Sequence, residues 1–456
     1  MIEKIKKSIV DEYNNTSLSA KLFLLWLLEP YYMTVARFVF HRLGLSDSII
    51  GTVLLIIVSF IPVLAFAVNI KKFDKKYYMP GIVLVLSVIV IFLLTIFIHP
   101  EYMRFFTKPG YGIERILRPD SALYAFVFVV LIDKSEEVIN IIKKYAVLDF
   151  IYMVIVDIIP RLTKGYFEDI SSYGEMVQRP YSLSFGYAML FPTIVFIYAL
   201  TKKFNVLYLI GAAIGAISIF QFGNRGAWLL IWGYVAVMII TRCIHSEKYV
   251  NLKKIIIILC TIVGVGVAAF GIPKVVGSVM INIAEQKEEE GKEIEVSRTA
   301  EFASEGKIAD GTGRDYIWGA VIDAIKDASK EGKVFGYGLY GDRPFVEPNH
   351  YAGYSHNIAL ELISNFGILG ILFLLKLIID GIRMVFLCKD ENYREIYVIT
   401  FVTSCQLLLS MSFWYVIEFW IMLGVSYSYI HRDGNIKTLG KIIKNKAVSK
   451  KEVSHE

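Results

Sequence analysis

Three polar segments interrupt an otherwise apolar sequence with side chains that suit anion binding and proton transfer. QFGNRGAWLL holds Arg225 between two apolar runs, ADGTGRDYIW holds Arg314 near the start of a predicted helix, and GYSHN holds His356 before another apolar run. Guanidinium groups bind phosphate oxygens through charge-assisted hydrogen bonds, and a neutral imidazole accepts a proton near pH 7. The sequence therefore offers two candidate anion-binding cations and one candidate general base.

Each of these residues also has a purely structural interpretation. Arg225 is expected at the membrane interface, where an arginine avoids the roughly 3 kcal/mol that insertion at the bilayer centre costs, and it would cap a turn there. Arg314 would pair with Asp310 or Asp315 on a solvated turn. His356 would bond to a backbone carbonyl. Residue types alone leave both interpretations open.

Further polar side chains near His356 extend the candidate site. Glu361 follows it by a little over one helical turn and is a candidate to orient the imidazole, while His350 competes for the role of base. Asp342 and Glu347 would add oxygen ligands if the two histidines held a metal ion. The histidines lack the helical i,i+4 spacing of a metal motif, so a metal site is disfavoured.

The composition predicts a polytopic membrane protein. Of 456 residues, 55% are hydrophobic and only 20% are charged, and the mean hydropathy is +0.54. A soluble globule needs more polar surface to cover its core. The net charge of +6 comes from short basic clusters between apolar runs, without the basic patch and stacking aromatics of a nucleic-acid-binding protein. The four cysteines form no CxxC pair, so no disulfide framework is indicated.

The apolar residues form runs that suit an all-α bundle of about twelve membrane helices. The predicted runs are 18–39, 46–69, 79–99, 119–132, 146–160, 182–200, 205–221, 226–241, 255–272, 356–380, 395–411 and 412–430. The fourth and fifth runs are short for a membrane crossing. Glu29 and Pro30 interrupt the first run and are expected to tilt or kink it.

Basic residues predict the orientation of this bundle. Lysines and arginines are concentrated in alternate short loops and in the C-terminal tail, which the positive-inside rule assigns to the cytoplasm. Both termini are then cytoplasmic, and the long polar segment late in the chain lies outside. The predicted parts are nine membrane helices in 1–272, a large external loop in 273–355, three membrane helices in 356–430 and a basic cytoplasmic tail in 431–456.

The external loop is expected to contain an amphipathic helix that covers the membrane domain. Apolar residues of DYIWGAVIDAIKDASKEG recur at helical spacing, namely Ile317, Val321, Ile325 and Ala328. Gly332 can end this helix in a left-handed conformation. The stretch that follows, rich in glycine, tyrosine and proline, is expected to form a structured loop.

The order of these motifs resembles the O-antigen ligase and O-antigen polymerase superfamily of bacterial envelope enzymes. GNRGAW is similar to the family's arginine at the outer end of a middle helix, and GTGRDYIWGAVIDA to its loop arginine before a helix. GYGLY and YSHNIALELISNFGILGIL are similar to its glycine-rich turn and to its Ser-His-Asn before a helix. The specific likeness covers about 150 residues, from Gly223 to Leu372. The N-terminal half agrees only in topology.

The resemblance implies a membrane-embedded, inverting glycosyltransferase that uses a polyprenyl-linked sugar and needs neither a metal ion nor a nucleotide sugar. By matching position, Arg225 and Arg314 would bind the diphosphate of an undecaprenyl-diphosphate-linked glycan, and His356 would deprotonate the acceptor hydroxyl. This sequence lacks a second arginine beside GNRGAW. Arg179, in the external segment GEMVQRPYS, is the candidate to supply it.

Three activities remain open at this point. A polymerase would transfer the glycan to another lipid-linked repeat unit. This hypothesis is favoured because polymerases also occur in bacteria without lipopolysaccharide. A ligase would transfer it to the lipid A core. A flippase for lipid-linked oligosaccharides is less favoured, because the chain shows no internal repeat. The expected location is the bacterial cytoplasmic membrane, with a flippase and a chain-length regulator as candidate partners.

Overall fold

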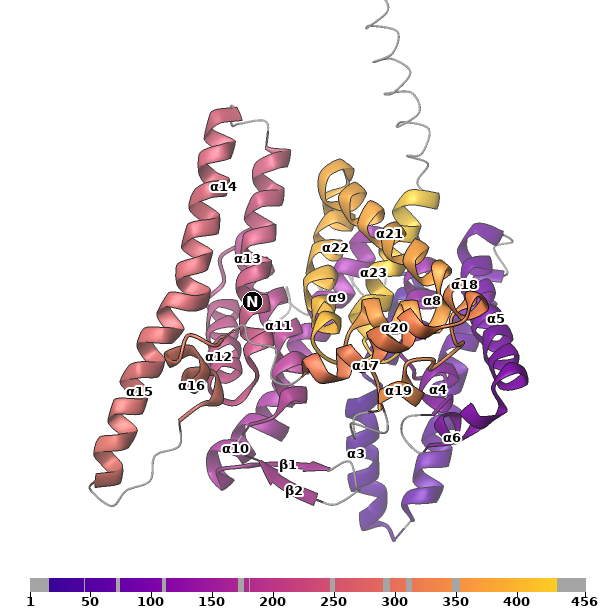
Figure 1. Ribbon diagram of the computed structural model, residues 1–456, viewed down its shortest axis with the longest axis horizontal. Helices are drawn as coiled ribbons and strands as arrows, with labels where there is room; N and C mark the ends of the chain where they lie inside the picture. Colours follow the sequence, from indigo (N-terminus) through magenta and orange to yellow (C-terminus); the bar gives the residue numbers. More distant parts are fainter. Residues whose placement is uncertain are drawn as a thin grey trace, which may run out of the picture.

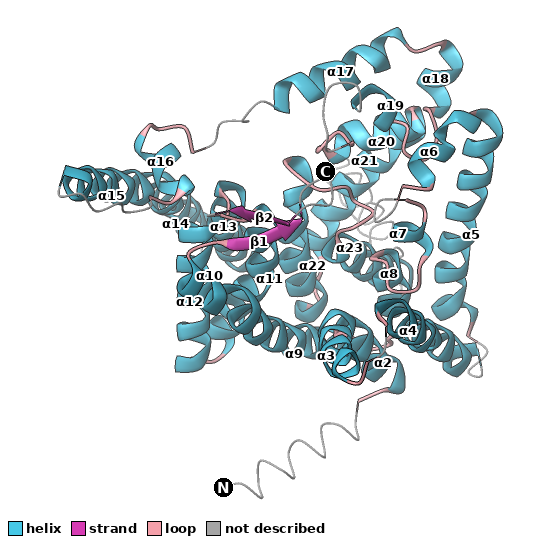
Figure 2. Ribbon diagram, turned by 90° about the horizontal axis from the view of Figure 1, so that it is seen from below, coloured by secondary structure: helices cyan, strands magenta, loops and turns pink. Residues whose placement is uncertain are grey.

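The chain folds almost entirely into helices. The computed structural model describes residues 16–44, 46–70, 74–108, 112–170, 176–179, 181–246, 251–289, 296–308, 314–346 and 353–432. Within them, each of the twelve predicted apolar runs overlaps at least one helix (Figure 1). A small hairpin departs from the predicted all-α fold: β1 (Phe167–Ile170) pairs antiparallel with β2 (Met176–Arg179). Figure 2 shows these strands in magenta, with β1 beside α10.

The helices fall into two groups by length. The longer ones are α2 (Leu18–Leu27), α3 (Glu29–Arg42), α4 (Asp47–Ile70), α5 (Lys75–Ile98), α8 (Leu123–Leu131), α9 (Ser135–Met153), α11 (Leu183–Lys202), α12 (Val206–Phe222), α13 (Arg225–His245), α14 (Asn251–Gly266), α15 (Ile272–Glu289), α17 (Arg314–Asp327), α20 (Ile358–Phe366), α21 (Ile368–Ile382), α22 (Glu391–Ser404) and α23 (Ile417–Tyr427). The shorter ones are α6 (Met103–Phe106), α7 (Glu114–Leu117), α10 (Ile159–Lys164), α16 (Arg298–Ser304), α18 (Lys330–Phe335) and α19 (Arg343–Val346).

Several described helices are suited to cross a membrane. Five are long and apolar enough, or six if the bent pair α2–α3 counts as one span. Large apolar side chains stand exposed on them, such as Phe60 at 65% and Phe97 at 85%. Such surfaces suit contact with lipid. The chain is a multi-pass membrane protein, while the count of twelve crossings stays a prediction.

The predicted kink in the first apolar run is present. Helices α2 and α3 meet at 58°, with Leu28 between them. Pro30 lies in the first turn of α3, where a helix tolerates the missing N–H. The bend brings Tyr31 to Asp149 of α9, whose carboxylate accepts its hydroxyl at 2.5 Å.

The short fourth run forms an internal helix. α8 has nine residues, and all of them except Tyr124 are buried. It packs against α23, α5 and α4. Gly424 of α23 allows close contact, since a Cβ there would lie 2.9 Å from the Val129 Cβ. A helix surrounded by protein needs no membrane-spanning length, which explains why this run is short.

The ninth apolar run continues beyond its predicted end at residue 272. A π-helical turn, Val267–Gly271, joins α14 to α15, and the combined apolar span covers 37 residues, Leu252–Glu288. At 1.5 Å per residue this is about 55 Å, well beyond the roughly 30 Å of a hydrocarbon core. The segment predicted to be loop from residue 273 therefore begins as helix. Figure 1 shows α14 and α15 as one long column at the edge of the bundle.

The predicted amphipathic helix is α17, and its apolar face packs as expected. Ile317 and Val321 are buried and form a small cluster with Val346. The predicted end at Gly332 is wrong: α17 stops at Asp327 and a second short helix, α18, follows. Ser329 caps α18 by accepting the Gly332 N–H, which places that glycine inside the new helix.

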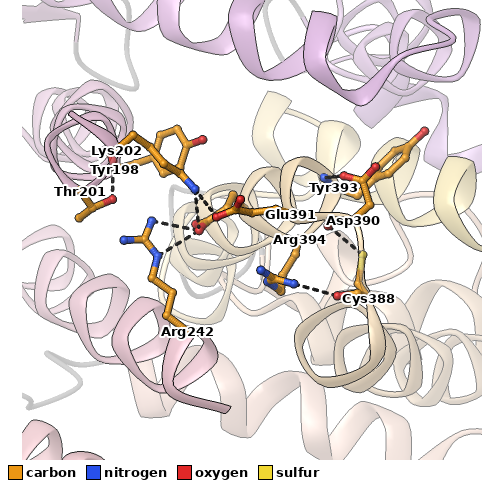
Figure 3. A network of polar contacts seen from close by, with 10 residues as sticks. Tyr198, Thr201, Lys202, Arg242, Cys388, Asp390, Glu391, Tyr393 and Arg394 are labelled. Atoms are coloured by element: carbon orange, nitrogen blue, oxygen red, sulfur yellow. Dashed lines mark hydrogen bonds and ion pairs between the residues drawn. The ribbon is translucent and has the colours of Figure 1, made fainter. Parts of the chain in front are cut away.

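A buried carboxylate joins three helices within a network of polar contacts that includes Lys202, Arg242 and Glu391 (Figure 3). Glu395 of α22 is 3% exposed and lies 3.0 Å from Arg242 of α13 and 3.7 Å from Lys202 of α11. Lys202 also pairs with Glu391 at the surface. These ion pairs fasten α11 and α13 to α22 at the end that the positive-inside rule assigns to the cytoplasm.

Candidate active site

Arg225 is the first residue of α13, at the tight turn that joins α12 to α13. Asn224 caps the helix, because its Oδ1 accepts the Ala227 N–H at 2.7 Å. The Asn224 Nδ2 donates to the Leu183 carbonyl of α11 at 2.9 Å. The GNRGAW motif therefore starts a helix and anchors it to a neighbouring one, which fixes the backbone position of Arg225.

Glycines let α11 approach this turn closely. A Cβ at Gly186 would lie 2.6 Å from the Asn224 amide nitrogen, and one at Gly226 would lie 2.5 Å from the Tyr187 hydroxyl. Real Cβ atoms do not approach so closely, so a larger residue at either position would require its neighbour to move. The glycines of the motif thus serve helix packing beside Arg225.

Three arginines from separate helices line one cavity of about 120 Å³. They are Arg225 of α13, Arg298 of α16 and Arg314 of α17, and Tyr181 and Tyr187 line the same cavity. The Tyr187 hydroxyl interacts electrostatically with both Arg225 and Arg314. The structure thus brings together the two arginines that the sequence singled out.

Aromatic rings hold two of these guanidiniums in place. The Cζ of Arg225 lies 3.8 Å from the centre of the Phe302 ring, and that of Arg298 lies 5.6 Å from it. Arg298 also donates to the Tyr181 hydroxyl and lies 4.6 Å from that ring. The Arg225 Nη1 donates to the Lys307 carbonyl at 2.5 Å. Cation–π contacts and hydrogen bonds offset the repulsion between like charges.

Arg298 was not predicted from the sequence as a site residue. It lies in the charged first part of the predicted external loop, yet Ser297 caps α16 by accepting the Ala300 N–H. The available signal was a capping serine followed by Arg298 and Phe302 one helical turn apart. Its contact with Tyr181, 117 positions away, could not be predicted from one sequence.

The cavity is cationic. Among the described residues that line it, none is an aspartate or a glutamate. Guanidinium groups match phosphate oxygens in pairs of parallel hydrogen bonds, so three of them suit an anion with several oxygens. The arrangement can bind a diphosphate and stabilise negative charge that develops on it.

His356 lies directly before α20 in a rare backbone conformation. Its φ is +53°, a left-handed value that few residues other than glycine adopt. Asn357, which follows it, caps α20, and the Ser355 N–H before it donates to Asp342 Oδ2 at 2.7 Å. The Tyr354 ring packs 4.1 Å from the imidazole, centre to centre. Both neighbours of His356 are therefore fixed by hydrogen bonds.

Two adjacent buried charges lie behind this segment. Asp342 is 0% exposed and Arg343 is 4% exposed. Burial raises the pKa of the Asp342 carboxyl, while the Arg343 charge and the Ser355 N–H oppose that rise. The Arg343 Cζ lies 3.3 Å from the centre of the Tyr340 ring, and its Nη2 donates to the Tyr415 hydroxyl at 2.9 Å.

One hydrogen bond links the His356 segment to the arginine cavity. The Asn357 Nδ2 donates to the Leu408 carbonyl at 3.4 Å, and the next residue, Leu409, lines the cavity. His356 itself does not line that cavity. The segment that carries His356 is therefore connected to the cavity through Asn357 and the residues that follow α22.

The secondary candidates have different surroundings. Glu361 is 1% exposed and its Oε1 accepts the Ser412 hydroxyl, so its proposed role in orienting the imidazole stays a prediction. Arg179 ends β2, is exposed, and does not line the arginine cavity. His350 lies outside the described residues.

Comparison with known proteins identifies the segment that holds all three main candidates. Residues 210–375 match the family model described as O-antigen ligase. The match includes Arg225, Arg314 and His356, and it covers the motifs on which the resemblance rests. No curated protein and no solved structure matched the chain. This match over residues 210–375 supports membership in the O-antigen ligase and O-antigen polymerase superfamily.

Proposed function

We propose that the chain is a polysaccharide polymerase for O-antigen, capsule or exopolysaccharide. It transfers a glycan from an undecaprenyl-diphosphate-linked donor to a hydroxyl of a lipid-linked repeat unit, with inversion and without a metal ion. One observation carries this proposal: Arg225, Arg298 and Arg314 line a cavity within the segment that matches the family. Such cations can stabilise the negative charge of a diphosphate leaving group.

The reaction is a single displacement. His356 accepts the proton of the acceptor hydroxyl, and the hydroxyl oxygen forms a bond to the anomeric carbon of the donor. The bond from that carbon to the diphosphate oxygen breaks, and its electron pair leaves with the diphosphate. Attack from the face opposite the leaving group inverts the anomeric carbon. Arg225 and Arg314 stabilise the charge that grows on the leaving oxygen, so they favour the transition state over the ground state.

The backbone at His356 supports its role as base. A left-handed conformation costs a residue with a side chain on the order of 1–3 kcal/mol, and such strain concentrates at active sites. Hydrogen bonds of the flanking Ser355 and Asn357 maintain the conformation. A positioned general base typically contributes 10²–10⁴-fold to the rate.

We place this chemistry at the outer face of the bacterial cytoplasmic membrane, with both termini in the cytoplasm. The arrangement of the helices supports this placement, since α13 begins at the arginine cavity and ends beside the Glu395 ion pairs. In Figure 1 the last turns of α13 lie at the upper end of the bundle, and β1 and β2 lie at the lower end. A flippase would deliver the donor to that face, and a chain-length regulator would limit elongation.

A ligase is the second candidate, because the matching family model carries that description. A ligase would use the same donor cavity and the same base but pass the glycan to the lipid A core. Presenting both acceptors to the purified protein separates the two, since a polymerase extends the lipid-linked repeat unit and a ligase glycosylates the core.

Elongation in a purified system tests the proposal. The protein in nanodiscs, given lipid-linked repeat units and EDTA, is expected to produce a ladder of longer glycans on a gel. His356→Ala is expected to abolish the ladder, and the control His99→Ala, at another histidine outside this site, is expected to keep it. A full ladder from folded His356→Ala protein would refute the catalytic role.

A further inference from the structure

A second cavity with three arginines lies apart from the first. Its volume is about 660 Å³, and it opens between α3, α4 and the α7 segment. Arg37, Arg115 and Arg118 line it together with Glu29 and Asp120. Three guanidiniums therefore face two carboxylates, which leaves the cavity with excess positive charge.

The charges in this cavity are arranged unequally. Arg118 pairs with Asp120 through two hydrogen bonds, of 2.5 Å from Nε and 2.6 Å from Nη2. Glu29 interacts electrostatically with all three guanidiniums. Arg37 and Arg115 are both exposed side chains on the cavity wall. An anion entering the cavity would thus meet Arg37 and Arg115, which come from separate elements.

Apolar side chains form the other wall of this cavity. Met33 of α3, Leu55 of α4 and Ile417 of α23 line it. The same two outer helices expose Phe38 at 61% and Ile56 at 53%. A cationic floor beside an apolar wall, on helices that face lipid, suits an amphiphile with an anionic head and a hydrocarbon tail.

The loop that carries these arginines is firmly held. The Trp26 Nε1 donates to the Pro119 carbonyl at 2.7 Å, and the Ser121 hydroxyl donates to the Ile116 carbonyl at 2.6 Å. The Tyr340 hydroxyl donates to the Gly112 carbonyl at 3.0 Å. Arg115 and Arg118 therefore project from a preorganised loop, as a binding site requires.

Contacts connect this cavity to the candidate base. Tyr415 lines the cavity, and the Arg115 Cζ lies 5.9 Å from the centre of its ring. The Tyr415 hydroxyl accepts from Arg343, and the adjacent Asp342 holds the N–H of Ser355. Ser355 directly precedes His356. This cavity is thus connected to the His356 segment through Tyr415, whereas the cavity with Arg225 is connected to it through Asn357 and Leu408.

We propose that this second cavity binds the lipid-linked diphosphate of the acceptor, a proposal that rests on the polymerase function above. The acceptor keeps its own diphosphate throughout the reaction, and only a hydroxyl of its glycan reacts. Two diphosphates must therefore be bound at once, on either side of the base. Arg37 and Arg115 contact the acceptor phosphates, and α3 and α4 contact its polyprenyl chain.

Binding of farnesyl diphosphate, a short polyprenyl diphosphate, tests this site without requiring elongation. Calorimetry on the full chain in nanodiscs is expected to show two sites. The double variant Arg225→Ala/Arg314→Ala is expected to keep one of them. Adding Arg37→Ala and Arg115→Ala is expected to weaken that remaining binding at least tenfold, whereas adding the control Arg104→Ala, at an exposed arginine outside the cavity, is expected to leave it unchanged.

Competing ligands identify what the site recognises. Inorganic pyrophosphate is expected to bind at least tenfold more weakly than farnesyl diphosphate, because it lacks the chain that contacts α3 and α4. Phosphatidylglycerol in the nanodisc is expected not to displace the probe. Equal binding of pyrophosphate, displacement by phosphatidylglycerol, or binding unaffected by Arg37→Ala and Arg115→Ala would each overturn the proposal. If the parent protein binds farnesyl diphosphate at this second site but does not elongate lipid-linked repeat units, the polymerase function is refuted and the second site is not.

Discussion

Arg298→Ala is expected to raise the KM for the lipid-linked donor roughly ten- to a hundredfold with a smaller effect on kcat. The cavity measures only about 120 Å³, so any bound diphosphate lies within reach of its guanidinium. A hydrogen bond to a charged group contributes about 1.5–3 kcal/mol. Each 1.36 kcal/mol corresponds to a tenfold change in a rate or equilibrium constant, and hence in the KM if it reflects donor binding. Initial rates of elongation at varied donor concentration measure the effect.

A conservative variant separates charge from stacking. Arg298→Lys keeps the charge but loses the contacts with the rings of Tyr181 and Phe302, which are worth about 0.5–1 kcal/mol at an exposed site. Its KM should therefore rise only about two- to fivefold. Lys326→Ala, which removes a surface cation of α17, should leave the KM unchanged. An unaltered KM in folded Arg298→Ala protein would show that Arg298 does not contact the donor.

Three further substitutions test how the fold supports the site. Gly226→Ala should lower elongation, since its Cβ would lie 2.5 Å from the Tyr187 hydroxyl and displace that side chain in the cavity. Gly233→Ala on the same helix meets open space and should preserve activity, so equal activities of the two variants would refute this packing role. Glu395→Ala should lower the unfolding free energy by about 3 kcal/mol, because it leaves the partly buried Arg242 guanidinium without its carboxylate. Glu391→Ala, at a carboxylate 59% exposed, should cost under about 1 kcal/mol. Similar melting temperatures for these two variants would contradict the assignment. His356→Gly should be at least as thermostable as the parent yet inactive, because glycine adopts a φ of +53° without strain; a large loss of thermostability would refute the strain interpretation.

Apolar runs predicted the position of the helices well because lipid contact and protein burial both demand apolar side chains. Residue 272 was the expected end of the ninth run, yet Pro273 lies in the first turn of α15 and the helix formed by α14 and α15 continues. A proline is tolerated near the start of a helical segment, and a π-helical turn precedes it. Run length also did not distinguish α8, which is surrounded by protein, from helices that face lipid.

Arg225 could be singled out because a charge between apolar runs is costly and therefore informative, and Arg314 because it lies near the start of a predicted helix. Arg298 was hidden because it lies among other charged residues, where one more arginine carries little signal. The cavity with Arg37 and Arg115 was likewise hidden, since it forms only when α3 and the α7 segment meet in the folded chain. Long-range contacts of this kind do not follow from local sequence patterns.

A cryo-EM map of the chain in nanodiscs with undecaprenyl diphosphate tests the central claim most directly. Density for the diphosphate is expected between Arg225 and Arg314, with the His356 imidazole facing the space where an anomeric carbon would lie. Diphosphate density remote from both guanidiniums, or an imidazole facing away from it across the bundle, would contradict the account.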